Sequence, residues 1–277
     1  MSAFSVKWRQ ARGILRKILV AAGFAASFCK RIAAVLIFLA AWELLPRSGA
    51  IDYFFLPPFS IVVETIYGML LDGELFVHLA ASLRRTLAGF TLGVSASVSA
   101  GLLIGWFRTV EKFADPLLQA FRQTSALALF PVFILFFGIG EVSKVAIIYW
   151  GVQWPILLNT ISGVKNVDPL LIKSARSMGA SNFTIFFRVV IPASLPYIFT
   201  GARLSATTSI LILIAAEMVG AKAGIGFLVF DAQQKFEIPR MYAGILLMSV
   251  LGFTANYLLL YLERRYTSWK QELMPRS

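Results

Sequence analysis

The sequence predicts an all-α, polytopic membrane protein, and three observations support this fold class. The 277 residues are 58% hydrophobic and only 14% charged, whereas soluble domains contain about 25% charged residues. Four uncharged runs are each long enough to form a helix that crosses the roughly 30 Å apolar layer of a bilayer. The basic residues gather at the two ends of the chain and in one internal loop.

About six transmembrane helices are expected. The four uncharged runs are Thr86–Phe107, Gln123–Gly140, Val145–Val164 and Met241–Leu262. A fifth span, Ser194–Val219, is apolar except for Arg203 and Glu217. A sixth, near Ile32–Pro46, is short and contains Glu43.

The charge distribution predicts the topology. Seven Lys or Arg residues and no acid lie in the first 31 positions, and four more basic residues follow the last span. Because Lys and Arg collect on cytoplasmic flanks, both termini are expected in the cytoplasm, and the net charge of +12 indicates topology rather than nucleic-acid binding.

The chain is expected to have three parts. A basic segment, 1–31, is expected to lie on the inner leaflet as an amphipathic helix. It is followed by a transmembrane domain, 32–264, and a cytoplasmic tail, 265–277.

An external segment is expected between the first two spans. The Pro-Pro turn of FLPPFS, residues 55–60, precedes a helical pattern that Ser60 can cap. Arg84 and Arg85 are expected at the outer headgroup level, with His78 as a solvated residue just before them. The single cysteine, Cys29, excludes an internal disulfide.

The second span carries a stripe of small residues on one helical face. Such residues at every fourth position let helix backbones approach closely. Chance occurrence in a span rich in Gly and Ala is the alternative. The stripe consists of Gly89, Gly93, Ser97, Gly101 and Gly105.

Polar residues within the later spans predict a translocation pathway. Polar groups at membrane depth are costly unless they face protein or water, and Pro131 and Pro155 free backbone carbonyls. Hydrogen bonding between helices without a transport role is the alternative, and Glu217 is interpreted either as a gate or inter-span hydrogen-bond residue or as a headgroup-boundary residue. The pathway candidates are Arg122, Gln123, Thr124, Ser125, Gln153, Trp154, Asn159, Arg203, Thr208 and Glu217.

The loop between the fourth and fifth spans predicts two short helices. Asp168 can cap a helix that has Pro169 at its first position, and this helix runs to about Met178. Gly179 is expected to end it in the left-handed conformation, and Ser181 to cap a second helix, Asn182–Ile191, that stops before Pro192. Lys173 and Arg176 share one face of the first helix, while Ala175 and Gly179 form a small-residue notch. A projecting helix of this kind suits a groove on a partner protein, and an ordinary interfacial helix is the alternative.

The same loop resembles that of a known family. The pattern Ala175, Gly179 and Val189-Val190-Ile191-Pro192 is similar to the "EAA…G…I-x-L-P" loop of binding-protein-dependent ABC-importer permeases. Further segments resemble the nitrate/sulfonate/taurine-type branch of that family, and the resemblance covers roughly residues 42–269. These segments are FGIGEVSK (137–144), GASNF (179–183), PASLPYIFTGARL (192–204), AAEMVGAKAGIGF (215–227) and LERRYTSW (262–269).

The resemblance implies a type I ABC-importer permease fold that functions as a dimer. It implies a homodimer that works with two ATP-binding subunits and an extracytoplasmic substrate-binding protein in the bacterial inner membrane. The loop would be the coupling helix, and its candidate ATPase contacts are Lys173, Ser174, Ala175, Arg176, Gly179, Ala180, Ser181 and Pro192. The implied substrate is a small anion such as a sulfonate, taurine, nitrate or bicarbonate, with a vitamin or pyrimidine-type precursor as the alternative.

Two departures from the family pattern affect these expectations. The Glu-Ala pair that usually begins the loop is Lys173-Ser174, so a basic contact to an acidic edge of the ATPase replaces a Glu-mediated one. The third span keeps Arg122 and Pro131 but has Gln123, Thr124 and Ser125 where the branch often has prolines. The substrates of the branch are therefore a weaker guide to the substrate of this chain.

The motifs indicate no enzyme. The chain has no phosphate-binding G-x-x-x-x-G-K-[ST] motif, no HExxH and no G-x-S-x-G. No catalytic residue, metal ligand or cofactor is therefore expected on this chain, and ATP and Mg²⁺ are expected on the partner subunit. A passive channel is the alternative of a different class, since a polar-lined bundle would look similar but would not need a coupling helix.

Overall fold

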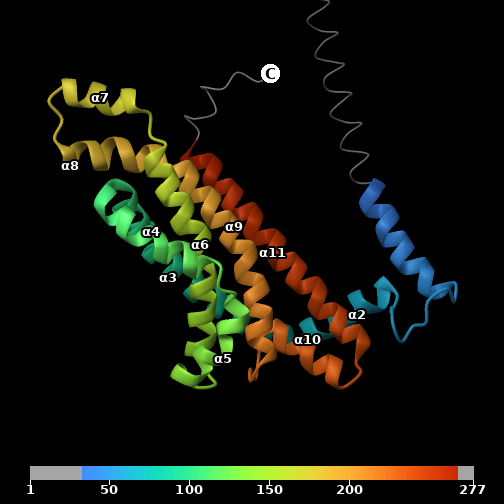
Figure 1. Cartoon of the computed structure of the whole chain (residues 1–277). Coiled ribbons are helices and arrows are strands. Elements are labelled where there is room, and N and C mark those ends of the chain that lie inside the picture. The colour runs from blue at the N-terminus through green and yellow to red at the C-terminus, as the bar shows by residue number, and fades with distance from the viewer. Residues whose placement is uncertain (1–32, 268–277) are drawn as a thin grey trace, which may run out of the picture. The chain divides into compact units, whose positions relative to one another are not determined.

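The computed structural model describes residues 33–267, and the regular structure in this range is helical (Figure 1). Expectations for the basic N-terminal segment and for the end of the tail concern residues outside this range. The chain divides into two compact units, Met1–Thr65 and Ile66–Ser277.

In the first unit, a helix over residues 33–47 leads through a turn to the start of α2 (Phe59–Leu71). Glu43 accepts hydrogen bonds from the backbone N–H and the hydroxyl of Ser60, both 2.9 Å long, and from Arg47 Nε at 2.6 Å. Because α2 begins at Phe59, Ser60 lies inside its first turn, and the predicted Ser60 cap is wrong. Glu43 satisfies this helix end instead, which explains an acidic residue in an otherwise apolar helix.

Four described helices are long and apolar enough to span a bilayer. They are α3 (Glu74–Trp106), α6 (Glu141–Lys165), the continuous stretch Asn182–Met218 that includes α9 (Ile191–Met218), and α11 (Ile238–Tyr266). Counted along the chain, they correspond to the second, fourth, fifth and sixth predicted spans, which are Thr86–Phe107, Val145–Val164, Ser194–Val219 and Met241–Leu262. The first predicted span, near Ile32–Pro46, overlaps the described helix over residues 33–47.

The third predicted span is broken. Amphipathic α4 (Arg108–Arg122) and apolar α5 (Ala126–Phe137) meet at a bend of 96°, and α5 is the only part of the predicted span Gln123–Gly140 that is helical. Gln123–Ser125 form the break, and Ser125 has extended backbone angles at the start of α5. Short polar side chains compete with helical hydrogen bonds for the backbone, which favours an interruption here.

The helix that begins at Asn182 does not stop before Pro192, contrary to the prediction. It passes from α8 (Asn182–Ile185) through a π-helical turn, Phe186–Val190, directly into α9. Ile191 donates its N–H to Phe186 O, five residues earlier. We attribute the continuity to this wider turn, which allows Pro192, lacking an N–H, to enter near the start of α9 without ending the helix.

The small-residue stripe of α3 packs against α6. A Cβ atom added to Gly89, Gly93, Gly101 or Gly105 would meet a side chain of α6 at 2.6–2.8 Å. From Gly89 to Gly105 the contacted residues are, in order, Ile148, Val152, Thr160 and Val164. Because both sets of residue numbers rise together, the two helices run in the same direction. The glycines therefore allow α3 and α6 to approach closely.

A second close contact joins α6 to α9. Gly201 of α9 lies against the backbone of Pro155 and Ile156, since an added Cβ would meet Pro155 O and Ile156 Cα at 2.9 Å. Ser205 donates a 2.7 Å hydrogen bond to Val152 O on α6. With α5, these helices enclose the main apolar cluster, which contains Phe130, Ile147, Ile148, Val152, Ile156, Ile212, Leu213 and Ala216.

The second unit has two distinct ends. α7 (Pro169–Ser177) and α8 lie at one end, where α6 finishes and α9 begins (Figure 1). The beginnings of α3 and α6, the end of α9 and α10 (Ile225–Gln234) lie at the other. We call these the α7 end and the α10 end.

Candidate functional site

The α10 end contains a buried polar network that joins α3, α6, α9 and the loop before α10. Its charged members are Arg85, Glu141, Lys144 and Glu217, and all of these except Glu141 are almost completely buried. A buried charge is tolerated only when it is paired and hydrogen-bonded, so the contacts of each residue determine what the network can do.

Glu217 is the acceptor at the centre of the network, with no exposed surface. Its carboxylate accepts hydrogen bonds from Ser82 Oγ at 2.8 and 2.9 Å, from an Arg85 guanidinium nitrogen at 2.7 Å and from the backbone N–H of Gly226 at 2.8 Å. The inter-span hydrogen bonding considered for Glu217 is present, whereas the headgroup-boundary alternative concerns depth in the bilayer and stays a prediction. In this conformation the side chain lines no open pathway.

Arg85 connects two carboxylates and one backbone carbonyl. Besides Glu217, it contacts Glu141 of α6 through two hydrogen bonds of 2.6 and 2.7 Å and donates to Ala223 O at 2.6 Å. Paired donation of this kind is the favourable geometry for arginine and carboxylate. Arg85 is 4% exposed and faces the neighbouring helices, whereas the neighbouring Arg84 side chain is 77% exposed. The headgroup level expected for the two residues stays a prediction.

Lys144 is held in a different way. The residue is 1% exposed, and its ammonium group donates to Gly140 O at 3.1 Å and to Gly220 O at 3.4 Å. It thereby ties the beginning of α6 to the loop that follows α9. Gly140 and Lys144 belong to FGIGEVSK and Gly220 to AAEMVGAKAGIGF, so two separate sequence motifs meet here.

Three side chains satisfy the first amide groups of α10. Gly224 N–H donates to His78 Nδ1 at 3.1 Å, Ile225 N–H to Ser82 Oγ at 2.8 Å, and Gly226 N–H to Glu217. These amides have no partner inside their own helix. The prediction that His78 is solvated is therefore wrong: it is 7% exposed because it packs against this loop.

The sequence interpretation missed Ser82, Arg85, Glu141 and Lys144 as network members. One signal was available: Glu74, His78, Ser82 and Arg85 continue the small-residue stripe of α3 toward its N-terminus at spacings of three or four residues, which keep them on the same helical face. The stripe was recognised where its residues are small, but its polar extension was interpreted as a headgroup boundary.

The pathway candidates of the third span gather at the α4–α5 break. Arg122, Gln123, Thr124 and Ser125 are all exposed in the single chain. Phe121 stacks on Trp154 of α6 with ring centres 6.3 Å apart and planes 19° apart. One predicted pathway residue of the fourth span therefore lies beside the break.

The other pathway candidates are dispersed. Gln153 and Asn159 are half-buried on α6, and Asn159 donates to Pro155 O at 2.8 Å. Arg203 is 3.4 Å from Glu263 of α11, and half-buried Thr208 lies further along α9. The ten candidates thus occupy separate places: the break and Trp154 beside it, other positions on α6 and α9, and the buried network.

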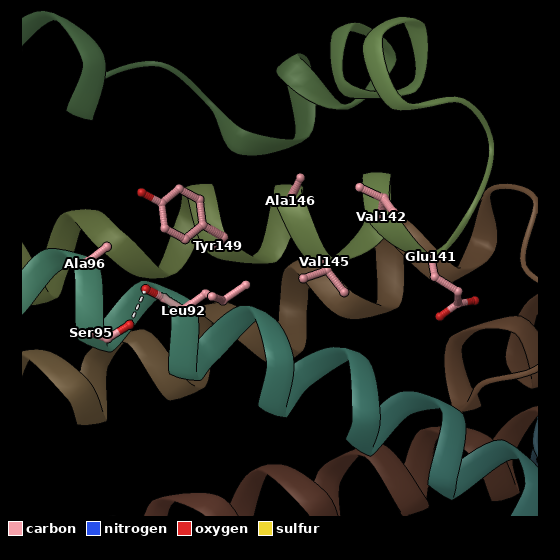
Figure 2. Close-up of a pocket in the computed structure, with 8 residues that line it drawn as sticks. All are labelled: Leu92, Ser95, Ala96, Glu141, Val142, Val145, Ala146 and Tyr149. Carbon is pink, nitrogen blue, oxygen red and sulfur yellow. Dashed lines mark hydrogen bonds between the residues drawn. The ribbon is translucent and has the colours of Figure 1, made fainter.

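A groove in the second unit lies along α3 and α6 and has a volume of about 750 Å³ (Figure 2). Ser95 donates to Leu92 O at 3.1 Å, and Glu141 is already bound by Arg85. We assign no ligand to this apolar surface. Its lining residues are Leu92, Ser95, Ala96, Glu141, Val142, Val145, Ala146 and Tyr149.

The α7 end carries the predicted two-helix loop. Asp168 caps α7 through a 2.8 Å hydrogen bond from Leu170 N–H, and Ser181 accepts from Thr184 N–H at 3.2 Å. Gly179 has φ of +81°. These three local predictions are confirmed.

The predicted notch on α7 is wrong. Ala175 is only 7% exposed, because it packs into an apolar cluster with Val164, Val167, Ile185 and Val190. The surface that α7 presents instead includes Lys173, Ser174, Arg176, Met178 and Gly179. Ala180 is half-buried, Ser181 is exposed and Pro192 is half-buried within the continuous helix.

Within residues 33–267 no group of three or more His, Cys, Asp or Glu side chains could hold a metal ion. The second unit instead combines closely packed spans, a broken span with polar residues at the break and a helix that projects at one end. This arrangement defines the class: a multi-pass helical membrane protein with the architecture of a transporter's membrane component.

The chain belongs to the family described as the binding-protein-dependent transport system inner membrane component, which matches residues 93–268. It is accordingly the permease component of an ABC importer rather than its ATPase, and it is of the nitrate/sulfonate/taurine-type branch. Permeases of this class work with ATP-binding subunits and a substrate-binding protein, generally as dimers.

Curated relatives have similar lengths. A putative aliphatic sulfonates transport permease of Bacillus subtilis is 35% identical, over 84% of this chain and 85% of the relative. The taurine transport permease of Escherichia coli K12 is 33% identical over 87% and 90%, and the bicarbonate transport permease of Synechococcus elongatus is 33% identical over 84% and 87%.

Solved structures support the fold. A chain of the MetNI methionine ABC transporter in an inward-facing conformation matches with a TM-score of 0.59 and 19% identity. The match covers 72% of this chain and 98% of that chain. The predicted type I ABC-importer permease fold is therefore confirmed.

Proposed function

We propose that this permease imports a small anion and is driven by ATP-binding subunits that contact α7. The observation that carries the proposal is the placement of α7: a short, capped helix with an exposed basic surface, projecting where α6 ends and the α8–α9 helix begins. A helix in this position can transmit a partner's movement to two spans at once.

The packing of α7 supports this role. Ala175 lies against Val164 and Val167 at the end of α6 and against Ile185 and Val190 of the following helix. Because packed interiors are dense and transmit strain, displacement of α7 would move both helices. α6 and α9 are themselves joined along their length through Gly201 and Ser205.

The charge on α7 defines the kind of contact. Lys173 and Arg176 are exposed, and Met178 beside them is 81% exposed. We propose that this surface contacts an acidic edge of the ATP-binding subunit, in place of the Glu-mediated contact usual in the family. ATP and Mg²⁺ would bind the ATP-binding subunit, and this chain would hold no cofactor.

The transport cycle would follow alternating access. Two copies of this chain would form the pathway between them, with both termini in the cytoplasm and the binding protein delivering solute at the α10 end. The exposed residues at the α4–α5 break, including Arg122, would line the pathway, since polar residues at membrane depth favour water or solute contact. Arg203 contributes less positive charge to the route because it pairs with Glu263.

The substrate class rests on relatives. The relatives named for aliphatic sulfonates, taurine and bicarbonate support a small anion of the sulfonate, taurine, nitrate or bicarbonate class. A vitamin or pyrimidine-type precursor is the alternative, because the residues Gln123–Ser125 differ from the branch's usual prolines.

The subunit composition is the first test. The tagged chain would be purified from its native host and its complex weighed by native mass spectrometry. We expect two copies of this chain together with two soluble subunits of ATPase size. A monomer or dimer that conducts solute in liposomes without ATP would contradict the proposal and favour a passive channel.

The coupling surface is tested by charge reversal in the same complex. Lys173→Glu should reduce substrate-stimulated ATPase activity at least about tenfold or dissociate the ATP-binding subunits, since like charges would then face each other. Lys222→Glu, an exposed lysine at the α10 end, is the matched control for binding of the ATP-binding subunits, which it should leave in the complex. If Lys173→Glu also keeps these subunits and its basal ATPase activity equals that of the control, Lys173 does not belong to the coupling surface.

A further inference from the structure

The only histidine of the chain, His78, has a different partner at each nitrogen of its ring. Nδ1 accepts the backbone N–H of Gly224 at 3.1 Å, and Nε2 lies 3.2 Å from Glu74 Oε1. Because a backbone N–H can only donate, Nδ1 carries no proton, and because an ionised carboxylate can only accept, Nε2 carries one. These two partners therefore select the neutral tautomer of His78 with its proton on Nε2.

The segment 223–226, which leads into α10, is held by four side chains, one at each residue. Three of these side chains belong to α3 and one to α9. The contacts are Arg85 to Ala223 O, Gly224 N–H to His78, Ile225 N–H to Ser82 and Gly226 N–H to Glu217. Among side chains, histidine is the one that ordinarily changes its charge between pH 5 and pH 8. The contact between His78 and Gly224 is thus the place where a proton could alter the hold on this segment.

A proton on Nδ1 would remove the acceptor of the Gly224 N–H. Two N–H groups would then face each other, and neither would have a hydrogen-bond partner in this contact. An unpaired buried donor is costly, and His78 is only 7% exposed, so little water could replace the lost bond. The loop before α10 would have to move away from α3.

The charged groups around the ring do not remove this conflict. Glu74 attracts a positive imidazole, but it acts at Nε2 and offers no acceptor to a proton on Nδ1. Arg240 of α11 also binds Glu74 Oε1, so this carboxylate is shared. From α10 the ring meets Phe227, which is uncharged and stacks on it with ring centres 6.0 Å apart. The other charged groups of the neighbouring segments are Arg85, Glu217, Lys222 and Glu237.

We propose that His78 is a pH-sensitive switch at the α10 end. The neutral side chain binds the loop before α10 to α3, and the protonated side chain releases it. Release at Gly224 also loosens the contacts of Ile225 and Gly226, because these residues follow directly in the chain. The side of the membrane whose acidity is sensed rests on the proposed function, which places the α10 end outside the cell.

The test uses the full-length chain in lipid nanodiscs, purified with a tag that contains no histidine. Labelling with ¹⁵N-histidine then gives the NMR signals of the His78 ring alone. We expect a proton on Nε2 only at pH 8 and on both ring nitrogens at pH 5, the range in which histidine ordinarily changes charge. Hydrogen exchange, corrected for the intrinsic effect of pH, should show about tenfold lower protection of the amides 224–226 at the lower pH, as expected for the loss of one buried hydrogen bond.

Two variants separate His78 from other acid-sensitive groups. His78→Asn places an oxygen that accepts at every pH where Nδ1 lies, and it should give equal protection in acid and in base. His78→Leu removes the acceptor and should lower the protection at both pH values. If the leucine variant does not fold, the parent chain and the asparagine variant still decide the matter. The amides of Ile147 and Val152 in the main apolar cluster are the reference and should stay protected in every chain.

Each contrary outcome overturns the inference. A proton on Nδ1 in base would mean the other tautomer. A ring that stays neutral in acid, or that becomes charged while the protection is unchanged, would mean that His78 is no switch. An equal acid response of His78→Asn would assign the response to another group such as Glu217. None of these results bears on the importer proposal, which native mass spectrometry of the complex tests separately.

Discussion

Arg85 of α3 and Glu217 of α9 form an ion pair 2.7 Å long that is almost entirely buried, with side chains 4% and 0% exposed. Lys165 and Glu111 form a pair of nearly the same length, 2.6 Å, with side chains 53% and 25% exposed. The distances do not distinguish the two pairs. Burial does, because water screens the second pair and is excluded from the first.

Removing Glu217 should therefore destabilise the chain far more than removing Glu111. Glu217→Ala leaves Ser82 Oγ and the Gly226 N–H without their acceptor and deprives Arg85 of one carboxylate, so we expect a loss of about 3–5 kcal/mol. Glu111→Ala should cost less than about 1 kcal/mol. Denaturant unfolding in nanodiscs measures both, and equal losses would show that the network adds no special stability.

The Arg85–Glu217 contact should also appear as coupling. Arg85→Ala leaves a buried carboxylate held only by Ser82 and Gly226, so each single variant should be severe while the double variant loses less than the sum. We expect a coupling energy of about 1–3 kcal/mol from a double-mutant cycle. Strict additivity would mean that the two side chains are stabilised independently.

Gly224 should resist substitution because of both its backbone and its neighbour. Its φ is +134°, and an added Cβ would collide with the carboxylate of Glu217. Gly224→Ala should cost at least about 1–3 kcal/mol and displace the loop before α10. Gly49→Ala is the control, since Gly49 also has positive φ, +77°, but nothing within 4 Å of an added Cβ. If the two variants unfold alike, the Glu217 contact is not what requires glycine.

The stripe on α3 predicts opposite outcomes for two helical glycines. A Cβ at Gly101 would lie 2.7 Å from Thr160 Cβ, so Gly101→Ala should separate α3 from α6 and cost about 1–3 kcal/mol. Gly68 of α2 has open space, and Gly68→Ala should be neutral or stabilising by up to about 1 kcal/mol through helix propensity. Thermal unfolding of the two variants compares them directly. A stabilised Gly101→Ala variant would exclude close packing at this position.

Local features were largely predictable from the sequence. Apolar length located the spans because the bilayer thickness sets it, and the caps at Asp168 and Ser181 and the turn at Gly179 followed from residues adjacent in the chain. Local predictions failed where the surrounding structure overrode the rule on which they were based. Pro192 was expected to end a helix, but the π-helical turn before it lets the helix continue.

Long-range partners were not predictable in the same way. Ser82 and Glu217 are 135 positions apart, and Arg85 and Glu141 are 56 apart. The helical spacing of His78, Ser82 and Arg85 indicates a shared face of α3, but it does not indicate which helix covers that face. Arg84 and Arg85 are the same residue type in adjacent positions, and only the packing exposes one and buries the other.

The sequence by itself determined the class of protein, its spans, the capped helix of the α7 end and the stripe on α3. Each depends on composition, on periodicity or on bonds between near neighbours. The tertiary structure decided that Ala175 faces inward, that the third span breaks at Gln123–Ser125 and that Glu217 meets Arg85. These three features depend on the packing of segments that are distant in the chain. Close packing excludes water, and a charge that is shielded from water requires a partner.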